Sequence, residues 1–88
     1  MTDLTILGRR NALPVLMDVV RDPGLTIGEY TQGDSNRHTA LQALRTHGLV
    51  RYADNLGDTR TKTVHPTANG ARMALLMVDA LAILEASQ

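Results

Sequence analysis

Residues 34–50 read DSNRHTALQALRTHGLV and carry the signals of one helix with a defined start and end. Asp34 and Ser35 are both residue types that cap helix N-termini, and Gly48 suits the left-handed position that ends a helix. Between them lies an apolar stripe formed by Ala40, Leu41 and Leu44. The pattern predicts a helix at residues 35–47 that buries one face and leaves the other polar.

Two further helices are predicted on the N-terminal side of this one. Residues 11–21 contain an apolar stripe at helical spacing, formed by Leu13, Leu16, Met17 and Val20. Because Pro14 is tolerated only in a first turn, either Asn11 caps this helix or a bend joins it to an earlier turn at residues 3–7. Thr26 is placed to cap a short helix at residues 26–31, which Gly33 closes.

A two-stranded hairpin is predicted at residues 49–65, on the C-terminal side of the central helix. Its first strand is LVRYA (49–53), its tip is DNLGD (54–58), and its second strand covers residues 59–65. Pro66 ends the second strand because it lacks a ladder donor, and Thr67 is placed to cap a last helix at residues 67–87. Gly70 reads as an ordinary weak point in the first turn of that helix.

The order of these elements predicts a mainly α fold with a β-hairpin wing, the winged helix-turn-helix, as a single domain of residues 1–88. Ala40-Leu41-x-x-Leu44-x-x-x-Gly48-Leu49-Val50 resembles the end of the recognition helix and the entry to the wing in many bacterial repressors, including the MarR and GntR families. Asp58-x-Arg60-x-Lys62-x-Val64-x-x-Thr67-x-x-Gly70 is the more specific match, since it resembles the wing of MarR-type regulators position by position. The resemblance covers residues 13–70. Arg37 and Pro66 depart from it, because that family usually has apolar residues at these two places.

Charge is distributed unevenly along the chain although the 9 basic and 9 acidic residues cancel. Residues 35–72 contain six Lys and Arg residues and only two Asp residues, a net charge of +4, and the remaining residues carry −4. The positive part coincides with the helix and hairpin that a winged helix presents to a DNA duplex. The chain is therefore expected to bind double-stranded DNA.

Polar residues of the central helix that lie off its apolar stripe are the predicted contacts to the major groove, and its N-terminal backbone N–H groups are predicted to be free for a phosphate. At the wing, the resemblance implies that Arg60 enters the minor groove, with Asp58 shaping the turn and Lys62 reaching the flanking phosphate. The predicted DNA-binding residues are Ser35, Asn36, Arg37, His38, Gln42, Arg45, Arg60 and Lys62. The alternative for the arginines is a solvated helix face, and for Asp58 and Arg60 a local ion pair.

The last helix is apolar on every side between residues 71 and 84, where only Arg72 and Asp79 are charged. One face can pack on the first helix, and a second copy of the chain is the simplest cover for the rest. The predicted dimer interface comprises Met73, Leu76, Met77, Ala80, Leu81 and Leu84. Such a homodimer predicts an inverted-repeat operator. The alternative is a helix buried entirely within its own domain.

Several function classes lack support in the sequence. There is no nucleophile–base spacing, carboxylate pair or Gly-rich phosphate loop, so we expect no enzyme and no cofactor. His38, His47 and His65 lack metal-ligand spacing, and the absence of Cys excludes a thiolate site, so no metal is expected. No signal peptide or membrane span is apparent, which favours a cytoplasmic protein. The competing function is a winged-helix protein-interaction module that uses the apolar last helix and does not bind DNA.

Overall fold

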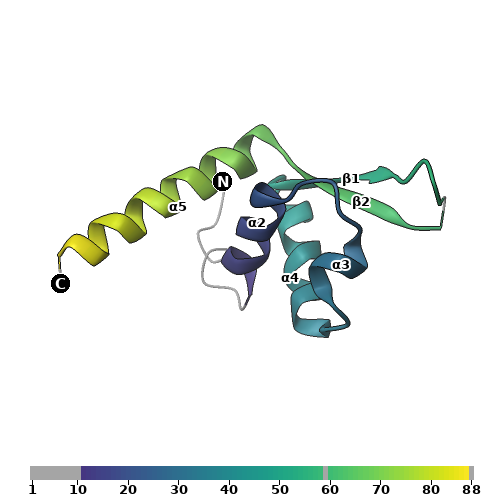
Figure 1. Ribbon diagram of the computed structural model, residues 1–88, viewed down its shortest axis with the longest axis horizontal. Helices are drawn as coiled ribbons and strands as arrows, with labels where there is room; N and C mark the ends of the chain where they lie inside the picture. The colour runs from purple at the N-terminus through teal and green to yellow at the C-terminus, as the bar shows by residue number, and fades with distance from the viewer. Residues whose placement is uncertain (1–10, 59, 88) are drawn as a thin grey trace.

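The computed structural model describes residues 11–58 and 60–87, which form a group of helices with one antiparallel hairpin (Figure 1). In chain order the elements are α2 (Ala12–Arg21), α3 (Ile27–Thr31), α4 (Ser35–Thr46), β1 (Val50–Asp54), β2 (Lys62–Pro66) and α5 (Ala68–Ala86). Helices α3 and α4 form a helix-turn-helix, the hairpin is the wing, and α5 follows it. The predicted fold class, a winged helix-turn-helix, is therefore confirmed.

The buried face of α2 differs from the predicted stripe. The buried residues are Ala12, Val15, Leu16 and Val19. Leu16 is the only member of the predicted stripe among them, and Leu13, Met17 and Val20 are half-buried. Both stripes have helical spacing and differ by a rotation of one residue, so periodicity alone does not choose between them. The structure buries the face with the smaller side chains, which lets α2 approach α4 and α5 closely.

The start of α2 is set by backbone geometry. Asn11 occupies the N-cap position in a left-handed conformation (φ 67°), and its side chain makes no capping hydrogen bond. Pro14 is exposed in the first turn, where its missing N–H is tolerated. The alternative turn at residues 3–7 lies outside the described residues.

Side-chain caps define α3 and α4. Thr26 Oγ1 accepts a hydrogen bond from Glu29 N at 3.2 Å, and Glu29 Oε1 accepts one from Thr26 N at 3.1 Å, which completes a capping box at the start of α3. Gly33 takes the left-handed conformation (φ +75°) after α3. Asp34, not Ser35, caps α4, because its Oδ1 accepts a hydrogen bond from Asn36 N at 2.8 Å.

In the hairpin, Val50 lies opposite Pro66 and Asp54 lies opposite Lys62. The second strand begins at Lys62, later than its predicted start at residue 59, because the tip is a structured turn. Thr61 N donates to Asp58 O at 3.2 Å, and Asn55 Nδ2 donates to Thr61 Oγ1 at 3.0 Å.

Gly70 lies in close contact with the backbone of Leu49, so the prediction that it is an ordinary weak point of the helix is wrong. It is buried in the first turn of α5, and a Cβ atom at this position would lie 1.8 Å from Leu49 O. Two hydrogen bonds hold the chain in this place: Thr67 N donates to Leu49 O at 3.1 Å, and Thr67 Oγ1 donates to Gly48 O at 2.6 Å. Only a residue without a side chain allows α5 to start this close to the wing.

The core lies between α2, α4 and the base of the hairpin, and only the beginning of α5 contributes to it. Its largest fully buried side chains are Leu16, Leu41, Leu44, Val15, Val19, Val50 and Val64. Beyond this region α5 leaves the core on the side opposite to the wing, and the molecule is 47 Å long and about half as wide (Figure 1). None of the helices in the described part of the chain is long and apolar enough to cross a membrane.

Candidate nucleic-acid interface

Helix α4 turns a polar face to solvent. Ala40, Leu41 and Leu44 are buried, as the apolar stripe predicts. The predicted DNA-binding residues that are exposed on this helix are Ser35, Asn36, His38, Gln42 and Arg45. The polar face of α4, as we call these five residues, includes hydrogen-bond donors and acceptors that can bond to base edges or phosphates.

The N-terminus of α4 is less open to a phosphate than predicted. Asp34 Oδ1 accepts hydrogen bonds from Asn36 N at 2.8 Å and Arg37 N at 3.4 Å. These backbone groups are already satisfied within the protein, and the capping carboxylate adds a negative charge beside them. The prediction of a free backbone site for phosphate is therefore wrong at these two amides.

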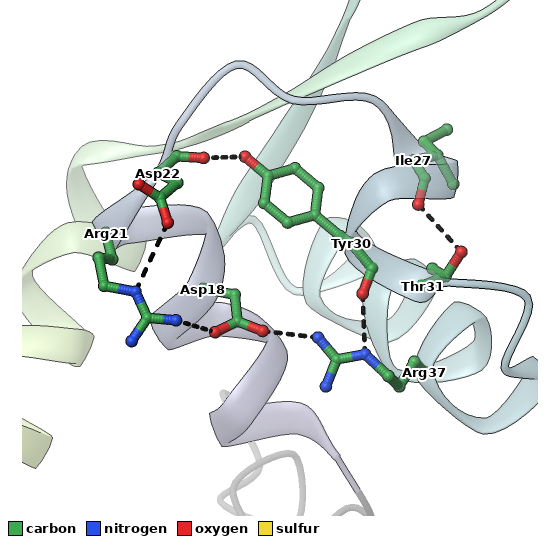
Figure 2. Close-up of polar contacts among 7 residues, drawn as sticks. All are labelled: Asp18, Arg21, Asp22, Ile27, Tyr30, Thr31 and Arg37. Carbon is green, nitrogen blue, oxygen red and sulfur yellow. Dashed lines mark hydrogen bonds and ion pairs between the residues drawn. The ribbon is translucent and has the colours of Figure 1, made fainter.

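Arg37 lies inside the helix-turn-helix. Its Nη2 donates to Asp18 Oδ2 at 2.7 Å, its Nε donates to Tyr30 O at 2.8 Å, and its side chain is 22% exposed (Figure 2). The prediction that Arg37 lies off the apolar stripe is wrong, because it precedes Leu41 by four residues and Leu44 by seven. The signal was available in this spacing, and in the apolar residue that the MarR resemblance implies at this position.

Arg45 is held against the wing. Its guanidinium carbon lies 4.5 Å from the centre of the Tyr52 ring, in a cation–π contact between α4 and β1. Burial raises the pKa of the Tyr52 phenol, and its hydroxyl is buried without a hydrogen-bond partner among the residues that the structure describes. The contact orients the Arg45 side chain, which remains exposed at the junction of helix and wing.

The tip of the wing presents an exposed cation beside a carboxylate. Asp58 Oδ1 accepts hydrogen bonds from Arg60 N at 2.9 Å and from Arg60 Nε at 3.4 Å, and the Arg60 side chain is 90% exposed. Gly57 N donates to Asn55 Oδ1 at 3.1 Å, which closes the turn from the other side. Asp58 therefore positions both the backbone and the guanidinium of Arg60.

Lys62 forms an ion pair with Asp54, its partner across the hairpin. The hydrogen bond and the positive charge of Lys62 lower the pKa of the Asp54 carboxyl. The Lys62 side chain is half-exposed, so a phosphate would have to compete with Asp54 for its ammonium group.

Most of α5 is exposed and receives little cover from the part of the chain that the structure describes. Among the predicted interface residues, Leu76, Leu81 and Leu84 are 60%, 55% and 61% exposed. Met73, Met77 and Ala80 are half-buried. Leu75, Val78 and Ile83 are exposed as well, so apolar surface continues around the helix. The alternative of a helix buried within its own domain is wrong.

Two residues that hold the helix-turn-helix in place, Asp18 on α2 and Tyr30 on α3, were not identified from the sequence. Asp18 bridges two arginines, because its Oδ1 accepts from Arg21 Nη2 at 2.6 Å while its Oδ2 accepts from Arg37 (Figure 2). Tyr30 is buried, and its hydroxyl accepts a hydrogen bond from Leu25 N and donates one to Asp22 O. Tyr30 thus fixes the loop between α2 and α3 through backbone groups of that loop, a contact that leaves no periodic signal in the sequence.

Comparison with solved structures relates this arrangement to known proteins, although neither a protein-family model nor a curated protein sequence matches the chain. The PcaV transcriptional regulator from Streptomyces coelicolor matches 86% of this chain with a TM-score of 0.77 and 20% identity. MarR matches 93% of the chain with a TM-score of 0.77 and 18% identity. MepR of S. aureus, solved as a DNA complex, matches 93% with a TM-score of 0.77 and 18% identity.

The chain spans only part of these proteins: 57% of PcaV, 64% of MarR and 72% of MepR. At these identities the likeness is one of fold, and it extends over α2 to α5 with the wing between them. The chain therefore has the MarR-like winged-helix fold.

Proposed function

We propose that the chain is a sequence-specific, double-stranded DNA-binding transcriptional regulator, with α4 in the major groove and Arg60 in the minor groove. The observation that carries the proposal is the wing tip, where Asp58 accepts two hydrogen bonds from a 90% exposed arginine. An exposed arginine at the tip of a hairpin suits the negative potential of a narrow minor groove. The resemblance of this wing to MarR-type wings and the DNA complex of MepR support the same function.

For the major groove we propose contacts from the polar face of α4. Asn36 and Gln42 can form paired hydrogen bonds with adenine, and Arg45 can bond to guanine or to a phosphate. Lys62 is proposed to contact a flanking phosphate once it leaves Asp54. Arg37 is not included among the direct contacts, because its guanidinium already binds Asp18 and Tyr30 O.

We further propose that two copies associate through α5. A leucine that becomes fully buried contributes roughly 1.5–3 kcal/mol, and Leu76, Leu81 and Leu84 are each more than half exposed in the single chain. A two-fold axis along α5 would place two α4 helices in successive major grooves, about one helical turn apart. The proposed target is therefore an inverted repeat. Transcriptional regulators of this fold, among them MepR in complex with DNA, support a DNA-binding role and not an enzymatic one.

The test is selection of bound sites from a random duplex pool, followed by anisotropy titration of the selected site and of random duplex. We expect an inverted repeat, and we expect affinity to fall steeply with salt because phosphate contacts release counterions. Arg60→Ala should weaken binding about tenfold, within the usual range for one groove contact. Arg72→Ala removes the same charge from an exposed position on α5, outside the proposed DNA-binding and dimer residues, and serves as the matched control. Equal affinity for all duplexes would refute sequence-specific binding.

A protein-interaction module remains the second candidate because the apolar surface of α5 can also bind another protein. The variant Arg60→Glu discriminates between the two functions. It should abolish DNA binding, whereas a complex formed through α5 should be unchanged.

A further inference from the structure

A carboxylate of α2 and a guanidinium of α4 meet where three helices come together (Figure 2). Arg37 is the third residue of α4, so it belongs to the first turn of the helix that carries the polar face. Its Nη2 contacts Asp18 on α2, and its Nε contacts the carbonyl of Tyr30 near the end of α3. One side chain thus ties the start of α4 to both preceding helices.

The contact between Asp18 and Arg37 is part of a small network of charged side chains. Both Asp18 oxygens are engaged, Oδ1 by Arg21 at 2.6 Å and Oδ2 by Arg37 at 2.7 Å, so the carboxylate is held from two sides. Arg37 is only 22% exposed, and hydrogen bonds between charged groups are short and directional. Without the Asp18 carboxylate, the partly buried charge of Arg37 would be incompletely paired, and the side chain would be drawn toward solvent.

The residues on either side of Arg37 are part of the polar face. Asn36 and His38 are exposed and belong to the same helical turn, so their positions change whenever the backbone of that turn moves. Contacts to base edges require side chains to be held within roughly 0.5 Å of the productive position. A small rotation of the first turn of α4 would therefore weaken discrimination between bases while leaving nonspecific attraction to phosphates in place.

We propose that Asp18 and Arg37 are positioning residues, and that this pair sets the orientation in which the first turn of α4 is presented to DNA. Asp18 thereby contributes to sequence discrimination although it lies on α2, outside the helix and wing that contact the duplex. The inference rests on the proposed function, DNA binding through α4. It differs from a direct role of Arg37, in which the guanidinium would itself bond to a base or phosphate.

The experiment measures the specificity ratio, the Kd for random duplex divided by the Kd for the selected site, in Asp18→Asn. This variant keeps the shape of the side chain and removes its charge. Asp22→Asn is the matched control, because it makes the same change in net charge and removes an exposed carboxylate that contacts Arg21 but not α4. Both variants should bind random duplex slightly more tightly than the unmodified chain. Only Asp18→Asn should lose about tenfold in specificity ratio.

The double variant Asp18→Asn/Arg37→Met removes both partners and leaves no unpaired charge, so it remains informative if Asp18→Asn alone folds poorly. We expect Arg37→Met and the double variant to lose specificity to the same extent, because removal of Arg37 already breaks the contact with Asp18. Asp18→Asn should lose no more than they do, because it keeps the bond from Arg37 Nε to Tyr30 O. Titrations are made well below the unfolding temperature, with the active fraction of each variant determined. A purely structural role would lower the active fraction without changing the ratio.

Two results would overturn the inference while leaving the proposed function intact. One is a specificity ratio in Asp18→Asn equal to that in Asp22→Asn. The other is tighter site binding in Asp18→Asn together with weaker binding in Arg37→Met, which would show that the released guanidinium contacts DNA directly. If the unmodified chain itself does not discriminate between duplexes, the proposed function fails, and the inference fails with it.

Discussion

Replacement of Gly70 by alanine tests the most restrictive contact in the fold. In an ordinary helix position this change stabilises a protein by roughly 0.5–1 kcal/mol, because glycine has a lower helix propensity than alanine. In this protein the new Cβ would lie 1.8 Å from Leu49 O and 2.8 Å from Leu49 C, both backbone atoms that cannot rotate away. A carbon and a carbonyl oxygen normally approach to about 3.3 Å, so α5 must move by roughly 1.5 Å.

The size of the effect follows from what this movement breaks. Thr67 N donates to Leu49 O at 3.1 Å and Thr67 Oγ1 donates to Gly48 O at 2.6 Å, and both bonds are lost if the start of α5 shifts. Each is worth about 1 kcal/mol, and overpacking of a buried site adds about 1–3 kcal/mol. After the gain in helix propensity, we expect Gly70→Ala to lower the free energy of unfolding by about 2–4 kcal/mol.

Urea denaturation followed by circular dichroism measures this difference, and a thermal melt should show a decrease in Tm of roughly 10–25 °C for a domain of this size. Gly28→Ala is the matched control, because Gly28 lies in α3 and a Cβ there would have no neighbour within 4 Å. It should leave stability unchanged or slightly increased. A Gly70→Ala protein as stable as the unmodified chain would refute the argument from close approach.

Three further predictions concern other parts of the molecule. Tyr30→Phe should lower the free energy of unfolding by about 1–3 kcal/mol in urea denaturation, because Leu25 N and a loop carbonyl lose their partner; an unchanged midpoint would contradict this. Lys62 lowers the pKa of the Asp54 carboxyl. The stabilisation from this ion pair is therefore present above the pKa of the unfolded chain, near 4, and is lost as pH falls through the lower pKa of the folded protein. The protection factors of the hairpin amides, which correct for intrinsic exchange, should therefore fall only in acid, and Lys62→Met should remove that dependence; an identical profile in the variant would count against the pair. Leu81→Glu should convert the proposed dimer to a monomer in sedimentation velocity without loss of helicity, since Leu81 is 55% exposed, and an unchanged sedimentation coefficient would exclude α5 as the interface.

The elements whose signals are local could be predicted from the sequence. Thr26 marks the start of α3, and Gly33 and Gly48 end the two helices of the helix-turn-helix in left-handed conformations. These features involve residues within a few positions of one another, so the chain needs no distant partner to express them. The predicted order of elements, and with it the winged-helix fold, depended on such local signals.

Parts of the candidate site could be anticipated for the same reason. The exposed residues of α4 follow from the position of Ala40, Leu41 and Leu44, because a helix turns its other face to solvent. The turn that Asp58 organises around Arg60 involves neighbours two residues apart. Their roles toward DNA remain predictions.

Only the tertiary structure decided which face of α2 is buried, which carboxylate pairs with Arg37 and why residue 70 is glycine. Two apolar stripes of α2 were equally periodic, and packing against α4 and α5 selected the one with smaller side chains. Arg37 faces inward because Asp18, nineteen residues earlier, supplies a carboxylate for it. Gly70 is required by the carbonyl of Leu49, which the fold brings against α5. Each of these depends on distances between segments far apart in the chain, and a sequence pattern records spacing along the backbone but not separation in space.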